Sequence, residues 1–167
     1  MMTMKIKLPQ LAASALLLVA TVTHAQPAPA TPPVHATANI SLSAAQQLIG
    51  QGLQQARGLS QNLAFAVVDR AGHLVALARM DQAALVTIDV AIGKARSAAY
   101  LNAPSKKFED FINAGQSAMV TTPNVLPLQG GVPLMHQGQI VGAVGVSGAS
   151  GAQDEALAQS LAATFAR

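Results

Sequence analysis

Cysteine and tryptophan are absent from this 167-residue chain, and only five residues are aromatic. Without cysteine there can be no disulfide, zinc–thiolate site, thiol redox chemistry or covalent c-type haem attachment. Nucleic-acid binding needs a basic patch, usually combined with aromatic stacking groups. The longest basic run is Lys106-Lys107. We therefore expect no nucleic-acid partner.

Charged side chains are scarce as well, at 10% of the residues, against about 25% in a typical globular domain. So few charges cannot coat the surface of an isolated small domain. The composition therefore predicts that sister subunits cover part of the surface, which makes the protein a homo-oligomer.

The first 25 residues have the pattern of a secretory signal peptide. Lys5 and Lys7 precede an apolar stretch at residues 11–22, and Thr23 and Ala25 supply small residues where a signal peptidase cleaves. The alternative is an uncleaved anchor, but the apolar stretch is shorter than the roughly 20 residues of a membrane span. The prediction is a periplasmic or secreted protein with no stable membrane span after cleavage. Removal of both lysines leaves eight basic and seven acidic residues, so the formal charge falls from +3 to +1.

Residues 26–39 are rich in proline, alanine and threonine and lack hydrophobic periodicity, which is typical of an extended linker. His35 belongs to this linker. The folded part is then residues 40–167, one domain by the usual size of about 100–150 residues.

Hydrophobic periodicity predicts alternating hairpins and helices in the folded part. Helices are expected at residues 44–56 (capped by Ser41 or Ser43), 83–101, 105–113 (capped by Ser105) and 152–165, and strands at 63–69, 74–80, 125–128, 132–136 and 139–147. The order α-ββ-αα-βββ-α predicts an α+β domain with an antiparallel sheet and helices packed against it.

Glycine is concentrated near the end of the chain, where five glycines lie within the fourteen positions from Gly138 to Gly151. Such a density predicts the close approach of another backbone or of a ligand. The loop before the last helix could bind a carboxylate or phosphate through its free N–H groups. The alternative is a close-packed turn in which Asp154 caps those amides. A nucleophilic Ser147 is disfavoured, because Ala149 replaces the last glycine of the G-x-S-x-G elbow.

Several sequence blocks together resemble one known family. They are VDRAGHL at residues 68–74, ARMD at 78–81, KARSAA at 94–99, GGVP at 130–133, and the glycine-dense stretch at 138–154. In this order and spacing they resemble the GlcG / HbpS family, also called the haem-degrading or PduO C-terminal-like domain. The resemblance covers residues 41–165 and groups the chain with the GlcG branch.

The resemblance implies a profilin-like α+β fold with a five-stranded antiparallel sheet flanked by helices. It also implies homo-oligomers, commonly tetramers or octamers, and haem as a cofactor, with a corrinoid as the lesser alternative. The leading hypothesis is therefore an exported haem-binding protein that serves haem or iron scavenging, degradation or sensing. Two alternatives stay open: an enzyme or accessory subunit acting on a small, glycolate-related organic acid, and a non-catalytic oligomeric interaction module.

Two positions depart from the family pattern. Exported haem-handling members carry an acid-x-x-acid pair assigned to iron on the long helix, and here Asp89 is followed by Ile92 at the second position. They also place a threonine five residues before the Gly-Gly pair, where this chain has Val125. These departures leave three alternatives open: weaker haem binding, another iron donor, or no haem binding.

The candidate binding residues follow from these considerations. His73 or Thr122 could supply the axial donor, Lys94 and Arg96 could hold the propionates or another carboxylate, and Gly130 and Gly131 could form a pocket wall.

Each candidate also has a purely structural interpretation. His73 could be a polar hairpin residue, the two cations could pair with Asp69, Asp81 or Asp89, and the glycines could permit close packing. His136 and Met80 are secondary candidates, the former more simply a turn residue and the latter a packing residue. No set of nucleophile, base and orienting residue is recognisable, so catalysis is left open.

Overall fold

A computed structural model describes residues 36–166 of the chain. Four strands form one antiparallel sheet in the order β2-β1-β4-β3: β1 (Ala64–Asp69), β2 (Leu74–Arg79), β3 (Gly131–His136) and β4 (Gln139–Ser147). Both hairpins, β1–β2 and β3–β4, were expected from the sequence. The predicted signal peptide and most of the predicted linker lie outside the described residues.

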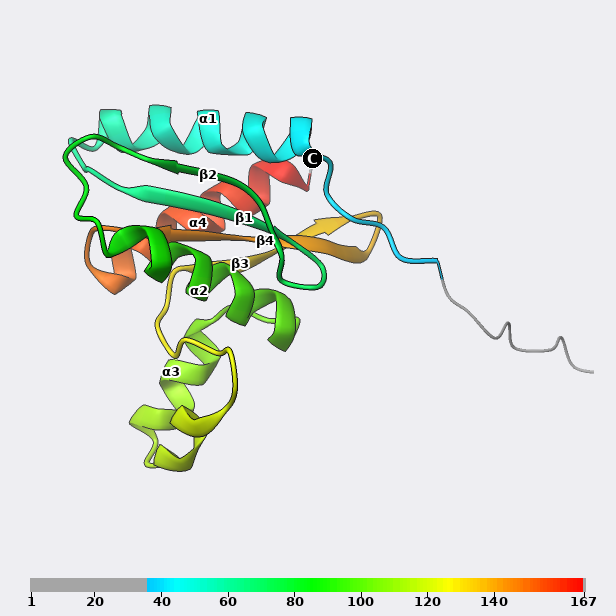
Figure 1. Ribbon diagram of the computed structural model, residues 1–167, viewed down its shortest axis with the longest axis vertical. Coiled ribbons are helices and arrows are strands. Elements are labelled where there is room, and N and C mark those ends of the chain that lie inside the picture. Colours follow the sequence, from blue (N-terminus) through cyan, green and yellow to red (C-terminus); the bar gives the residue numbers. More distant parts are fainter. Residues whose placement is uncertain (1–35, 167) are drawn as a thin grey trace, which may run out of the picture. The chain divides into compact units, whose positions relative to one another are not determined.

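Helices cover both faces of the sheet (Figure 1). They are α1 (Leu42–Gly58), α2 (Thr87–Leu101), α3 (Lys106–Asn113) and α4 (Gly151–Phe165), with a short 3-10 helix η1 (Ser117–Thr121) after α3. Helices α1 and α4 pack on one face and α2 on the other, while α3 and η1 form a lobe beyond α2 (Figure 1). The prediction of an α+β domain with an antiparallel sheet is confirmed. No helix within residues 36–166 is both long and apolar enough to cross a membrane.

Short polar sequences set the helix boundaries. The Ser41 hydroxyl accepts a hydrogen bond from the Ala44 N–H and begins α1. Ser150 and Gln153 form a reciprocal capping box at the start of α4. Helix α2 begins at Thr87, later than predicted, and ends at Leu101, where the cap residue Asn102 adopts the left-handed conformation.

The two faces of the sheet are built from side chains of different size. Towards α1 and α4 the core consists of large apolar residues, among them Phe65, Val67, Val144, Val146, Leu48, Leu157 and Leu161. Towards α2 it consists mainly of alanine: Ala64, Ala66 and Ala143 on the strands against Ala91, Ala95 and Ala98 on the helix. A Cβ on Gly145 would lie 2.1 Å from the Ala91 carbonyl oxygen. The predicted close approach of another backbone to β4 is therefore confirmed, and that backbone is α2.

The predicted fifth strand, residues 125–128, does not form, and the sheet has four strands rather than five. Ser97 of α2 occupies the main-chain groups that a neighbouring strand would have used. Its hydroxyl accepts from the Leu126 N–H at 2.7 Å and lies 3.1 Å from the Leu126 carbonyl oxygen. Leu126 also packs over Gly93 of the same helix. The apolar run is thus a segment held against α2 by side chains.

Ser105 precedes α3 but makes no side-chain capping bond there. Its hydroxyl instead donates to the Leu128 carbonyl at 2.7 Å and accepts from the Gly131 N–H at 2.9 Å. The residue predicted to cap a helix therefore joins the 125–128 segment to the start of β3.

Candidate functional site

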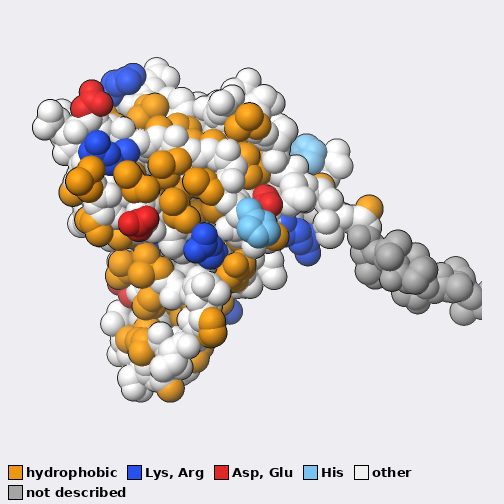
Figure 2. Space-filling model, viewed as in Figure 1, with side chains coloured by type: hydrophobic (Ala, Val, Ile, Leu, Met, Phe, Trp, Pro, Cys, Tyr) orange, Lys and Arg blue, Asp and Glu red, His pale blue; other side chains and the backbone are white. Residues whose placement is uncertain are grey.

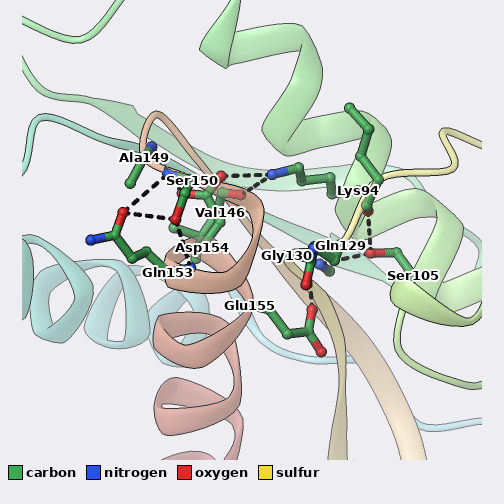
Figure 3. Close-up of polar contacts among 12 residues, drawn as sticks. Lys94, Ser105, Gln129, Gly130, Val146, Ala149, Ser150, Gln153, Asp154 and Glu155 are labelled. Atoms are coloured by element: carbon green, nitrogen blue, oxygen red, sulfur yellow. Dashed lines mark hydrogen bonds and ion pairs between the residues drawn. The ribbon is translucent and has the colours of Figure 1, made fainter. Parts of the chain in front are cut away.

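A buried ion pair lies where α2, the end of β4 and the start of α4 meet (Figure 3). The Lys94 Nζ is 2.8 Å from Asp154 Oδ2 and donates to the Val146 carbonyl at 3.0 Å. The two side chains are only 4% and 2% exposed. The other carboxylate oxygen of Asp154 accepts from the Ala149 N–H at 3.0 Å. Lys94 of α2 thus contacts both β4 and α4. Its ion-pair partner is Asp154, not Asp69, Asp81 or Asp89 as expected from the sequence.

Gly130 and Gly131 lie beside this ion pair and allow β3 to approach α2. A Cβ on Gly131 would stand 2.0 Å from the Lys94 carbonyl oxygen. Gly130 has a φ of +117°, and its N–H donates to Glu155 Oε2 at 2.7 Å. The close-packing interpretation of this glycine pair explains both positions, because a side chain would collide with main-chain atoms.

A cavity of about 340 Å³ opens next to the ion pair. We call it the Lys94 cavity. Its lining residues are Val90, Lys94, Glu109, Leu128, Gln129, Ser147, Ala149, Gly151 and Asp154. Glu109 of α3 forms one wall, where its two carboxylate oxygens accept from the Gln129 backbone N–H at 2.7 Å and side-chain Nε2 at 3.2 Å. The cavity is therefore polar, with a buried charge pair on one side and a carboxylate on another.

A second polar cluster lies at the β1–β2 turn. The His73 Nδ1 is 3.4 Å from Asp69 Oδ2, and the His73 backbone N–H donates to the same carboxylate at 2.8 Å. Arg96 of α2 donates from Nε to the Gly72 carbonyl at 3.3 Å. The His73 side chain is 81% exposed. With Nδ1 turned to the carboxylate, the imidazole presents Nε2 outwards, which is the arrangement commonly seen in metal-ligating histidines.

An apolar surface adjoins this cluster, and Figure 2 shows hydrophobic side chains gathered over β2 and α2. We call it the β2–α2 face; its exposed large residues are Leu74, Leu77, Leu85, Val86 and Tyr100. Leu74 and Leu77 pair with Val68 and Ala66, so both lie on the side of the sheet that carries α2. A patch of this kind beside polar groups is typical of an interaction surface.

The structure separates candidates that the sequence placed together. Lys94 and Arg96 are two positions apart on α2, so they point to different sides of the helix: Lys94 into the buried cavity and Arg96 towards the hairpin. Lys94, Gly130 and Gly131 form one cluster, and His73 and Arg96 form the other. Thr122 follows η1 in the lobe and belongs to neither.

The remaining sequence candidates also lie outside both clusters. His136 is exposed at the end of β3, and Met80 accepts a hydrogen bond from the Leu63 N–H through its sulfur. Asp89 is exposed and Ile92 is partly buried. Among residues 36–166 no group of three or more histidine, aspartate or glutamate side chains could hold a metal ion.

Sequence reasoning missed Glu109 and Gln129 as cavity residues and considered Asp154 only as a cap. Glu109 and Gln129 are twenty positions apart, and Lys94 and Asp154 sixty. No local spacing could have joined them. The only available signal was the polarity of residues flanking the glycine-dense stretch.

The sequence model of the family described as "Haem degrading protein HbpS-like" matches residues 40–163. Protein GlcG of Escherichia coli strain K12 is 41% identical over 108 residues, which is 65% of this chain and 81% of GlcG.

Two solved structures extend the comparison to the fold. A double mutant of HbpS from Streptomyces reticuli superposes with a TM-score of 0.74 at 29% identity, covering 86% of this chain and 99% of that one. A PduOC:haem complex superposes with a TM-score of 0.68 at 25% identity, covering 77% and 99%.

Proposed function

This chain belongs to the HbpS-like family of haem-degrading proteins, and from that premise we propose that it binds haem, with His73 as the axial donor. The family description and the PduOC:haem complex support a haem-related function. The observation that carries the choice of donor is the His73–Asp69 contact, which orients an exposed imidazole at the rim of the β2–α2 face.

The residues around His73 suit the parts of a haem group. Leu74 and Tyr100 provide partly exposed apolar surface for a macrocycle. Within residues 36–166 the Arg96 side chain bonds only to Gly72, through Nε, so its terminal nitrogens have no partner there. An arginine fork matches a propionate carboxylate. Lys94 is committed to Asp154, which leaves Arg96 as the better propionate partner. Haem, when bound, would supply the redox chemistry of its iron, and the protein would supply position and access.

Haem on the β2–α2 face would need a second copy of the chain to shield it from water. The face is an open surface rather than a closed slot, and ligand sites usually bury most of the ligand surface. We propose a homo-oligomer, a tetramer or octamer, that covers this face. The scarcity of charged residues and the five exposed large apolar side chains support it.

The assembly can be tested by light scattering coupled to size-exclusion chromatography. Leu77→Glu places a charge in the middle of the face and should lower the measured mass to that of a smaller species. Leu42→Glu changes another exposed leucine, at the start of α1, and should leave the mass unchanged. A mass equal to the monomer for the unaltered chain would reject the oligomer.

Haem binding is tested by titrating haemin into the full chain and following the Soret band. We expect a saturable shift that His73→Ala abolishes. His136→Ala is the matched control, because it removes another exposed histidine beside a hairpin turn. Thr122→Ala tests the other donor suggested by the sequence.

The outcomes separate the cofactor from its ligand. A shift that survives His73→Ala but not Thr122→Ala would move the donor to the lobe, and one that survives both would keep haem and reject both residues. A spectrum that is the sum of free haem and protein would reject haem binding. Repeating the titration with a cobalamin tests the corrinoid alternative.

The export of the protein is a separate proposal that rests on residues 1–25 alone. The basic start, the apolar stretch and the small residues before position 26 support cleavage after Ala25. N-terminal sequencing of the protein from a periplasmic or culture fraction should begin at Gln26. Recovery of the whole chain in the cytoplasm would contradict export.

A further inference from the structure

Ser147 at the end of β4 is a buried residue whose hydroxyl is open to the Lys94 cavity and has no partner among residues 36–166. The residue is only 5% exposed and lines the Lys94 cavity, yet its hydroxyl makes no hydrogen bond to any of residues 36–166. A hydroxyl that is open to a small cavity and has no protein partner is satisfied by water or by a ligand. The Ser147 hydroxyl is therefore available to a polar group that enters the cavity.

Further donors converge on the same cavity. The Gly151 N–H is the first of α4, and it has no acceptor among the described residues, whereas Ala149 and Ser150 donate to Asp154 and Gln153. The start of a helix carries partial positive charge. The Lys94 ammonium has three protons, of which Asp154 and Val146 accept two. Ser147, Gly151 and Lys94, each of which carries a hydrogen-bond donor, thus line one small space.

This arrangement binds rather than catalyses. Serine becomes a nucleophile only when a neighbouring base removes its proton. Lys94 donates to Asp154 and to the Val146 carbonyl, so it is not positioned as that base. The donors instead match a carboxylate, whose two oxygens accept several hydrogen bonds at once.

Glu109 restricts which carboxylate can enter. Its side chain lines the cavity and bonds only to Gln129 among residues 36–166, with no cation in contact. A second negative charge on the ligand would face this carboxylate and be repelled. Val90, Leu128 and Ala149 add apolar wall, and a cavity of about 340 Å³ is at the small end of ligand sites, about 300–1,000 Å³.

From these observations we propose that the Lys94 cavity binds a short-chain monocarboxylate, with its carboxylate held by Ser147, Gly151 and Lys94. Glu109 disfavours dicarboxylates and phosphate more than a monocarboxylate, because they carry more negative charge. The site is distinct from the His73 cluster, so this proposal does not depend on haem binding.

Saturation-transfer NMR on the full chain tests the proposal, with acetate and lactate as monocarboxylate probes and succinate as the dianion. We expect saturable transfer to acetate and lactate and none to succinate. Ser147→Ala should weaken binding about tenfold, since it removes a hydrogen bond to a charged group. It should leave the folded protein intact, because the hydroxyl has no partner within residues 36–166. Ser147→Val fills the space and should abolish transfer.

Two controls complete the experiment. Ser160→Ala removes a serine hydroxyl that binds Gln55 away from the cavity, and it should leave acetate binding unchanged. Glu109→Gln should allow succinate to bind. No transfer to either monocarboxylate, or equal transfer in the unaltered chain and in both Ser147 variants, would overturn the proposal. Neither result would alter the haemin titration, so the two proposals fail separately.

Discussion

The two faces of the sheet are packed with side chains of different size, and they contribute differently to the protein. The face under α1 and α4 is filled by phenylalanine, leucine and valine, which bury much apolar area and supply the main hydrophobic stabilisation. The face under α2 is filled by alanine and glycine, which bury little area but bring the helix backbone against β4. Because α2 lies so close, Lys94 can reach across to the end of β4 and the start of α4. We call the alanine-filled side under α2 the thin face and the side under α1 and α4 the thick face. The buried ion pair lies on the thin face, whereas the thick face buries most of the large apolar side chains.

The strongest test of this contrast removes the charge that crosses the thin face. Lys94→Met leaves Asp154 buried and unpaired, so we expect the free energy of unfolding to fall by about 3–5 kcal/mol. Denaturant unfolding at fixed protein concentration measures the loss. Adding Asp154→Asn to Lys94→Met should recover part of it, because the orphaned charge is gone. A double variant as unstable as the sum of the single variants would show that the two residues are not coupled.

Enlarging a small residue on the thin face should be the next most damaging change. Gly145→Ala would drive a methyl group into the Ala91 carbonyl, and such overpacking costs about 1–3 kcal/mol. Gly50→Ala is the matched control, because that glycine lies in α1 with nothing within 4 Å of an added Cβ. It should stabilise the protein by about 0.5–1 kcal/mol. Equal thermal shifts for the two variants would contradict the close packing of α2.

The segment at residues 125–128 tests the thin face from its outer side. Ser97→Ala removes the hydroxyl that accepts from the Leu126 N–H, and leaving that N–H without its partner should cost about 1–3 kcal/mol. Hydrogen exchange of the Leu126 amide should accelerate far more than that of the β1 amides. Unchanged exchange at Leu126 would mean that the side chain packed over Gly93 holds the segment without Ser97.

An exposed ion pair provides the smallest expected effect. The hydrogen bond to Asp110 on α3 raises the pKa of Lys106 above its ordinary value of 10.5. The pair therefore contributes fully below that pH and loses its contribution as the pH rises through the folded-state pKa. Lys106→Gln should leave stability at pH 7 nearly unchanged, since exposed pairs contribute little. A large loss at pH 7 would place Lys106 in a buried contact in the assembled protein.

Local sequence patterns were sufficient for most of the elements but not for the fifth strand. The hairpins follow from apolar runs around Gly72 and around Gln137-Gly138, where the positive φ values of Gly72 and Gly138 favour glycine. Residues 125–128 form an apolar run of the same kind, yet they are not a strand. The difference lies in Ser97, a residue 29 positions away, whose hydroxyl accepts the hydrogen bond of the Leu126 N–H. A short apolar run does not reveal which partner its backbone will find.

The sequence by itself determined the fold class, the family and the presence of unusually close packing near the end of the chain. Periodicity, turn residues and glycine density depend only on residues that are close together in the sequence, so they can be recognised without the tertiary structure. The tertiary structure alone decided that Lys94 and Arg96 serve different sites, that Asp154 pairs with Lys94, and that Glu109 and Ser147 face one cavity. Those assignments depend on which side of α2 each residue takes and on contacts between residues up to sixty positions apart, which only the packing of helices on the sheet establishes.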